Sequence, residues 1–384
     1  MEDFLLLDEL LSDESKLMRE STREFINREV KPIIGDAFEK AQFPMELIQK
    51  IGEMGLLGCT LPEKYGGLDS NYMSYGIINQ ELERGDSGIR SFVSTQSSLC
   101  MFPIFSFGSE EQKKKYLPKL ASAELIACFG LTEPDGGSDL TAMDTRAEKT
   151  TDGWIVNGTK SWSGNALFAD LAVVWAQTEE GIRGFLIEKE FNGFQRIDLK
   201  KKMSLRASGT GVLVMENCFV PEENCLPHVK GTEGPRSCLN QAQYAVAWGV
   251  IGAAIDCYEM AVQYTTERKQ FGKPIASFQL IQKDLSKMLT EITKAQLMNV
   301  RLGQLKDEGK DTPDMTSMAK MNACKEALAI ARLSRNLLGA NGISLEYPVI
   351  RHMINLESTL TSEGANNFHQ LVLGEHITGF NALS

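Results

Sequence analysis

Two charged residues of this 384-residue chain occupy positions where a carboxylate and a guanidinium could do chemistry. Glu363 follows an apolar helical stretch that includes Met353 and Leu356, and it precedes Gly364, a residue type that often ends helices. A carboxylate at a helix end that faces a cleft can be placed as a general base. Arg90, in the segment DSGIRS, could bind a carboxylate through its forked guanidinium. A solvated glutamate and a surface ion pair are the ordinary alternatives.

Composition and simple motifs exclude several other kinds of site. The eight cysteines form no C-x-x-C pair and there are only four histidines, which argues against a zinc site or disulfide framework and favours buried thiols. A net charge of −11 with scattered Lys and Arg argues against nucleic-acid binding. No run of 18 apolar residues occurs, so we expect no membrane span. The acidic N-terminus lacks the basic region of a signal peptide, and we expect a cytoplasmic protein.

Three segments of different periodicity must position these residues. Helical spacing dominates residues 1–123, and again residues 237–384, where Met318, Met321, Cys324 and Leu328 form a stripe typical of core packing. Between them, residues 124–236 contain short runs rich in β-branched and aromatic residues, separated by turn signals such as TTDGW and NGTK. We therefore predict an α+β multi-domain chain. It consists of an N-terminal helical domain, a middle antiparallel β-barrel-like domain and a C-terminal helical bundle, with these boundaries.

The chain resembles the acyl-CoA dehydrogenase family over essentially its whole length. The strings that carry the resemblance are, in order, CFGLTEPDGGSD (128–139), KSWSGN (160–165), ERKQFGKPI (267–275), LLGANGI (337–343) and SEGANNFH (362–369). Two further strings, ELERGDSGIRSFVSTQSSL (81–99) and SLRASGTG (204–211), are similar to the glutaryl-CoA dehydrogenase branch. The resemblance implies an FAD-dependent oxidoreductase that acts on an acyl-CoA or acyl-carrier thioester. It also implies a homotetramer, or dimer of dimers, and an electron-transfer flavoprotein as partner. Because no G-x-G-x-x-G or P-loop is present, FAD would bind outside a Rossmann site, between the β-domain and the C-terminal helices.

The resemblance assigns a role to each charged residue. Glu363 would remove the α-proton of the thioester while hydride leaves the β-carbon for flavin N5. This proton is only weakly acidic, so the site must stabilise the enolate and exclude water. The stabilising bonds would come from the flavin ribityl chain and from the backbone N–H of Glu363. Arg90 would bind a distal carboxylate, with Glu83 in the same polar network. The other substrate contacts implied are Ser91, Ser138, Gln243 and Tyr244.

The same resemblance implies a set of flavin contacts. Trp162 would cover the isoalloxazine ring, and Arg268 and Phe271 would reach the FAD of a neighbouring subunit, since an arginine matches pyrophosphate in charge and shape. Ordinary core packing for Trp162 and a helix-surface charge for Arg268 are the alternatives. The full set is Phe129, Leu131, Thr132, Ser138, Trp162, Gly164, Arg268, Phe271, Asn336, Gly339, Ala365 and Asn367.

Five positions depart from the family pattern near the site. Gly164 replaces a hydroxyl residue beside flavin N5, and Ser362 replaces the tyrosine of the glutaryl branch. Gln243 replaces an arginine near the thioester, Ala340 a glycine, and Ala365 a threonine. Together they favour a specialised relative that keeps flavin, base and guanidinium but acts on a different acyl thioester, with a dicarboxylic or otherwise polar acyl group. Ordinary oxidation of glutaryl-CoA with decarboxylation is then not expected.

Three other functions remain open at the level of sequence. Space opened at Gly164 could admit O2 and give a flavin oxygenase or oxidase. Loss of the arginine at Gln243 is compatible with a desaturase for carrier-protein thioesters in a biosynthetic pathway. The changes at Ala340 and Ala365 are compatible with a scaffold that has lost FAD, although tight binding sums many contacts and loses only about 1 kcal/mol with each.

Overall fold

The N-terminal part is a group of helices that ends before the first strand. The computed structural model describes residues 1–382. The helices are α1 (Asp13–Phe25), α2 (Lys31–Lys40), α3 (Glu46–Glu53), α4 (Tyr72–Gly85), α5 (Ser87–Ser94), α6 (Phe102–Phe107) and α7 (Glu110–Ala121), with π-helical segments η2 (Ile26–Val30) and η4 (Thr95–Met101). Side-chain caps explain several starts: Ser109 and Gln112 form a reciprocal capping box at α7.

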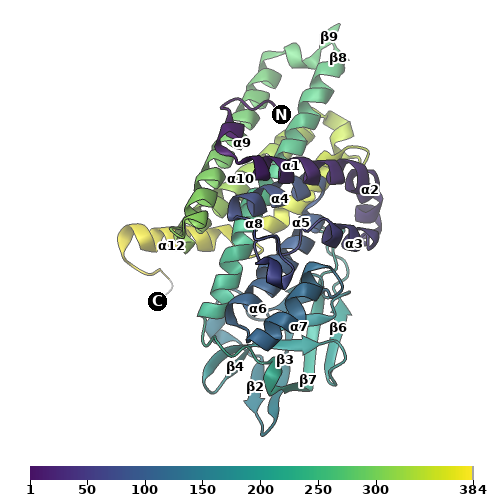
Figure 1. The fold of residues 1–384 in the computed structure, drawn as a ribbon. Coiled ribbons are helices and arrows are strands. Elements are labelled where there is room, and N and C mark those ends of the chain that lie inside the picture. Colours follow the sequence, from purple (N-terminus) through teal and green to yellow (C-terminus); the bar gives the residue numbers. More distant parts are fainter. Residues whose placement is uncertain (383–384) are drawn as a thin grey trace.

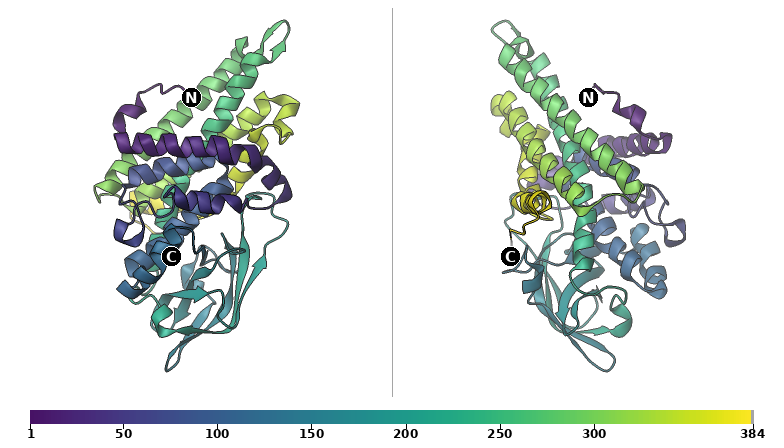
Figure 2. Two further views of the ribbon diagram at one scale, coloured as in Figure 1. Left: turned by 45° about the vertical axis from the view of Figure 1, so that its right-hand side comes forward. Right: turned by 90° about the vertical axis from the view of Figure 1, so that its left-hand side faces the viewer.

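The C-terminal part is built on one long helix. Its helices are α8 (Glu233–Glu267), α9 (Gln279–Asp307), α10 (Pro313–Leu337), α11 (Pro348–Thr359) and α12 (Asn366–Thr378). Helix α8 packs against α4 and α10, and the strands β8 (Lys269–Gln270) and β9 (Lys273–Pro274) form a hairpin at the far tip of α8 and α9 (Figures 1 and 2). Among residues 1–382, α8 alone is long and apolar enough to cross a membrane. However, 78% of its apolar window is buried inside the protein, as in a core helix.

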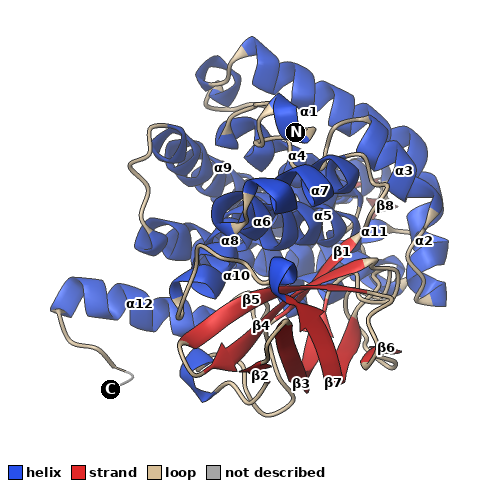
Figure 3. Cartoon of the chain, turned by 60° about the horizontal axis from the view of Figure 1, so that its bottom comes forward, coloured by secondary structure: helices blue, strands red, loops and turns tan. Residues whose placement is uncertain are grey.

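The middle part is one curled seven-stranded sheet below the helices (Figure 3). Its strands are β1 (Ala127–Gly130), β2 (Arg146–Lys149), β3 (Gly153–Ser163), β4 (Leu171–Thr178), β5 (Gly181–Glu188), β6 (Phe194–Asp198) and β7 (Gly211–Pro221), in the order β1-β4-β2-β3-β7-β6 with β5 beside β4. The three-part architecture is confirmed. The strands are not all antiparallel, because β4 runs parallel to both β1 and β2, whereas the hairpin-connected neighbours are antiparallel. The domain boundaries at 123/124 and 236/237 stay predictions.

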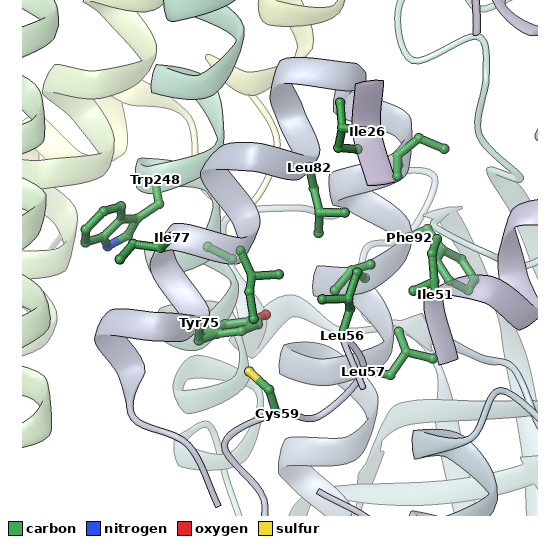
Figure 4. Close-up of a cluster of buried hydrophobic side chains, with 14 of the residues drawn as sticks. Ile26, Ile51, Leu56, Leu57, Cys59, Tyr75, Ile77, Leu82, Phe92 and Trp248 are labelled. Atoms are coloured by element: carbon green, nitrogen blue, oxygen red, sulfur yellow. The ribbon is translucent and has the colours of Figure 1, made fainter. Parts of the chain in front are cut away.

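Helix α4 is buried along nearly its whole length, so its charged residues need partners inside the protein. Its apolar side chains join a cluster with Ile26, Phe92 and Trp248 (Figure 4). Every residue from Met73 to Gly85 is buried, including Glu81 and Glu83. Because a buried charge is unfavourable unless it is paired, these carboxylates must meet cations from other elements. The fold therefore brings charged side chains into the interior next to α8.

Candidate active site

Glu363 lies in the turn that connects α11 to α12. Its backbone adopts a left-handed conformation with φ 55°, and Gly364 follows with φ 98°. Positive φ is unfavourable for a non-glycine residue and persists where the surroundings impose it. Two side chains from other helices bind the turn: Gln243 Nε2 of α8 donates to the Glu363 carbonyl at 2.9 Å, and Lys320 Nζ of α10 donates to the Gly364 carbonyl at 2.6 Å. The carboxylate is thus presented from a braced turn.

The Glu363 carboxylate has no hydrogen-bond partner within the described chain. Its Oε2 atom is buried and unpartnered among residues 1–382. Burial raises the pKa of Glu363, while the charges of Arg90 and Lys320 oppose the rise. Burial lowers the pKa of Lys320, whose ammonium binds a carbonyl instead of the carboxylate. A buried carboxylate with a raised pKa and free acceptor atoms is the arrangement a general base needs.

Arg90 and Glu83 form a buried pair near Glu363. Arg90 Nε donates to Glu83 Oε2 at 2.6 Å and Arg90 Nη1 donates to Ser94 Oγ at 3.1 Å, while Ser87 Oγ donates to Glu83 Oε1 at 2.7 Å. Burial alone would lower the pKa of Arg90, but the charges of Glu83 and Glu363 outweigh it and raise that pKa. The guanidinium is therefore partly engaged already, and its Nη2 is the nitrogen without a bond to residues 1–382.

Comparison with known proteins matches three consecutive domains of one family. The acyl-CoA dehydrogenase N-terminal domain matches residues 12–124, the middle domain residues 128–218 and the C-terminal domain residues 230–378. The chain belongs to the acyl-CoA dehydrogenase family. It is 36% identical over 380 residues to the glutaryl-CoA dehydrogenase of Desulfococcus multivorans, covering 96% of this chain and 97% of that protein.

Solved structures of family members have the same fold. A glutaryl-CoA dehydrogenase from Mycobacterium smegmatis in complex with FADH2 superposes with a TM-score of 0.97 and 45% identity, covering 98% of this chain and 97% of that one. The butyryl-CoA dehydrogenase of Megasphaera elsdenii gives a TM-score of 0.92 and 32% identity, covering 96% of this chain and 98% of that one. The similarity therefore extends through all three parts of this acyl-CoA dehydrogenase family member.

The end of β3 displays an aromatic ring that the fold itself does not cover. Trp162 is 62% exposed and has a positive φ of 59°, and Asn165 two residues after Ser163 has φ 63°. Asn165 Nδ2 donates to the carbonyls of Phe92 and Ala127, both at 3.3 Å, which ties this turn to α5 and β1. The alternative of Trp162 as a core residue is thereby wrong, because most of its surface is open.

The segment after β1 is fixed mainly through its backbone. Phe129 and Leu131 are buried in the core, while Ser161 N donates to the Thr132 carbonyl at 2.7 Å. Lys160 Nζ, fully buried, donates to the Leu131 carbonyl at 3.0 Å. The side chains of Phe129 and Leu131 thus pack inside the protein, and only their backbones could meet a ligand. Ser138, farther along the loop, is exposed.

Other site residues expected from the sequence do not lie around Glu363 within this chain. Arg268 and Phe271 belong to the β8–β9 hairpin at the far tip of α8, where Phe271 is 92% exposed (Figure 1). Asn336 and Gly339 are exposed at the end of α10. Tyr244 is a correction: it is fully buried, its hydroxyl donates to the Tyr72 carbonyl at 2.8 Å, and its ring contacts the Tyr72 and Trp248 rings. One residue along a helix changes direction by about 100°, so Tyr244 points away from the side where Gln243 meets Glu363.

The turn around Glu363 also shows what two of the substitutions do. Ala365 is the N-cap of α12 and supplies no side-chain cap, a position where threonine would cap the helix. Ser362 directs its hydroxyl to the Ser358 carbonyl at 2.7 Å. Asn367 is exposed in the first turn of α12 and Ser91 is half-buried on α5.

Sequence reasoning missed three residues beside the site. Lys320 lies next to the stripe of Met318, Met321, Cys324 and Leu328, which predicts only core packing, and Thr95 is in a string quoted for its resemblance alone. His369 is buried, its Nδ1 lies 3.0 Å from Ser317 Oγ, and its Nε2 has no partner among residues 1–382. Burial and the Lys320 charge lower the pKa of His369 to about 4, which keeps the ring neutral. The signal that could have found Lys320 is an ionisable residue four positions before Cys324, one helical turn from a residue of that stripe.

Proposed function

We propose that the protein is an FAD-dependent acyl-thioester dehydrogenase in which Glu363 removes the α-proton and the β-carbon loses hydride. The single observation that carries this proposal is the buried, unpartnered Oε2 atom of Glu363, in a turn bound by Gln243 and Lys320. Burial raises the pKa of this carboxylate, so it is a stronger base than a solvated glutamate.

The chain offers surfaces that fit FAD. A large aromatic ring, Trp162, is 62% exposed at the end of β3, and an exposed apolar ring of this size is suited to stacking. Bound FAD supplies the hydride acceptor. The neighbour from Mycobacterium smegmatis was solved with FADH2, which supports the same cofactor here.

The Glu363 backbone supports the second requirement of the reaction. Its N–H donates to no acceptor among residues 1–382, although the neighbouring N–H groups of Ser362 and Asn366 are bonded. A free N–H beside the base can donate to the thioester carbonyl as negative charge develops on its oxygen. In the reaction one C–H bond then gives its proton to Glu363 and the other its hydride to the cofactor, which leaves a C=C bond between α and β.

Arg90 supports a polar acyl group. Its pairing with Glu83 leaves Nη2 for a hydrogen bond, so the site suits a carboxylate or a neutral polar tail. The Ser362 hydroxyl is bonded to its own helix and supplies no phenol beside the base. We therefore propose oxidation without release of CO2. We further propose that the protein is a cytoplasmic homotetramer in which the exposed Arg268–Phe271 hairpin contacts the cofactor of a neighbouring subunit. Its electrons would pass to an electron-transfer flavoprotein.

An anaerobic titration of the visible flavin spectrum tests the proposal. Glutaryl, 4-hydroxybutyryl and butyryl thioesters would be compared, each on CoA and on a phosphopantetheinyl carrier protein. We expect the polar-tailed thioesters to bleach the flavin of the wild type and none to bleach Glu363→Gln. Equal bleaching by butyryl thioester would refute the role of Arg90, and CO2 release from glutaryl thioester at the rate of flavin reduction would refute oxidation without decarboxylation.

The titration also separates the open alternatives. Bleaching only by carrier-bound thioesters would indicate the carrier-protein desaturase. Oxygen incorporated into product under air would indicate the oxygenase. A colourless protein that cannot be reconstituted with FAD would indicate the scaffold and overturn the proposal as a whole.

A further inference from the structure

The glycine at position 164 has one close neighbour, and that neighbour is a hydroxyl. A Cβ built on Gly164 would lie 3.0 Å from Thr95 Oγ1, with the Thr95 carbon atoms Cγ2 and Cβ at 3.8 and 3.9 Å. No other side chain or backbone atom is as near to that point. The missing side chain at residue 164 is therefore matched by the hydroxyl of a residue from another element.

Thr95 is a buried polar side chain that the chain itself does not satisfy. It is 3% exposed at the start of η4, and its hydroxyl makes no hydrogen bond among residues 1–382. The other hydroxyls of η4 are bonded: Ser97 Oγ accepts from Gly58 N at 2.9 Å, and Ser98 Oγ lies 2.7 Å from Tyr75 Oη. Buried hydroxyls normally have partners, and π-helical segments often occur at functional sites. The Thr95 hydroxyl, which borders the space left by Gly164, is therefore available to a ligand.

We propose that Thr95 supplies, from η4, the hydrogen bond to the reactive N5 of FAD that Gly164 cannot make from β3. The proposal rests on the proposed function only in that FAD lies against the Trp162–Gly164 segment. The hydroxyl would then come from a helical segment and not from the turn that follows a strand. A full side chain at both positions would be crowded, because a Cβ on residue 164 approaches Thr95 more closely than ordinary van der Waals contact. One hydroxyl residue and one small residue therefore share the space.

The same geometry bears on oxygen. Thr95 occupies the side of Gly164 where the sequence suggests an opening, so wild-type reduced enzyme should react slowly with O2. Removing the threonine methyl and hydroxyl should open that space and speed the reaction. Slow reaction of the wild-type enzyme with O2 would support a dehydrogenase and contradict the oxidase alternative.

The test measures the flavin of the substrate-free holoenzyme. In Thr95→Val we expect a change of about 30 mV in the two-electron midpoint potential, the equivalent of a tenfold change in the redox equilibrium, because the hydroxyl would donate to N5 of the oxidised flavin but could only accept from the N5–H of the reduced one, and the two bonds differ in strength. Thr95→Ser should keep the wild-type potential, and the exchanged double variant Thr95→Ala with Gly164→Thr, which again pairs one small residue with one hydroxyl residue, should recover it. In Thr95→Ala, reoxidation of the reduced flavin by O2 should be several times faster.

Ser98→Ala is the matched control. Ser98 is an equally buried hydroxyl residue of the same π-helical segment, but its partner is a protein side chain. Its removal should leave the flavin potential unchanged. An unchanged potential in Thr95→Val, or an equal shift in Ser98→Ala, would overturn the proposal. The potentials are measured without substrate and with Glu363 unchanged in every variant, so the proposed reaction can fail while this assignment stands, and the reverse.

Discussion

Two buried carboxylates lie near buried lysines in this protein, and they differ in what the lysine binds. In the β-domain, Lys160 Nζ donates directly to Glu133 Oε1 at 2.8 Å, and the Asp144 and Thr145 backbone N–H groups donate to the same carboxylate. At the site, Lys320 donates to the Gly364 carbonyl, and Glu363 Oε2 is left without a partner.

The difference separates a structural ion pair from a reactive group. Burial alone would raise the pKa of Glu133, but the bonds from Lys160 and Thr145 outweigh it and lower that pKa to about 2. Burial raises the pKa of Glu363, and the more distant charges of Arg90 and Lys320 do not cancel the effect. A direct bond from a lysine lowers the basicity of a carboxylate, as at Glu133. At Glu363 the lysine binds the carbonyl of the next residue, so its charge stays near while the carboxylate oxygens remain free.

The largest expected effect is at the base. Glu363→Gln should lower kcat by about a thousandfold, the scale of a lost general base, because the amide keeps the shape but cannot take a proton. FAD content, measured by absorbance, should stay at the wild-type level. Glu133→Gln is the companion variant: per folded and FAD-loaded molecule it should keep most of its activity, and equal losses in the two variants would erase the proposed difference.

The next largest effect is on the stability of the protein and should follow from changing Glu133. Glu133→Gln leaves Lys160 buried without its charged partner, and we expect a loss of about 3–5 kcal/mol in the free energy of unfolding. Denaturant titration measures it. Glu363→Gln should lose much less, or gain stability, because no ion pair is broken. A Glu133→Gln variant as stable as the wild type would contradict the structural role.

The pH dependence should have opposite signs at the two carboxylates. Because the pKa of Glu133 falls from 4.5 unfolded to about 2 folded, its stabilisation is present above pH 4.5 and is lost as the pH falls toward 2. The pKa of Glu363 is raised, so the folded state binds the extra proton and this contribution is lost as the pH rises through the raised value. Unfolding free energies against pH for wild type, Glu133→Gln and Glu363→Gln would separate the two signs.

Removing the site lysine should move the kinetic profile. As the proposed base, Glu363 would act deprotonated, so kcat/KM should fall as the pH is lowered through its pKa. Lys320→Met removes a nearby positive charge, which should raise that pKa further and shift the acid limb to higher pH. Lys306→Met is the control, since that buried lysine is paired with Asp311. An unshifted limb in Lys320→Met would show that the lysine acts only on the backbone of the turn.

The smallest expected effect concerns the cap after the base. Ala365→Thr places a hydroxyl at the N-cap of α12 and should raise the free energy of unfolding by about 1 kcal/mol. Ala365→Val matches its shape without the hydroxyl and should give no such gain. Equal stability of the two variants in denaturant titration would show that residue 365 does not cap the helix.

Much of this protein could be predicted from local patterns. The order of helices, strands and helices follows from periodicity and turn residues, and the position of Glu363 before Gly364 at the end of a helix is visible in neighbouring letters. Such features depend on residues a few positions apart, where backbone geometry leaves few choices. The family resemblance, not a local pattern, predicts that Glu83 and Arg90 share a network, and the structure places Arg90 Nε 2.6 Å from Glu83 Oε2.

Only the tertiary structure decided what surrounds the base. Gln243 meets the Glu363 carbonyl from 120 residues away, and Lys320 meets Gly364 across 44. Thr95 faces Gly164 only because η4 packs against β1 and lies beside the turn after β3, and Tyr244 is turned into the core by the same helix that presents Gln243. Contacts between distant elements depend on how whole helices and strands pack, and composition and spacing do not specify that packing.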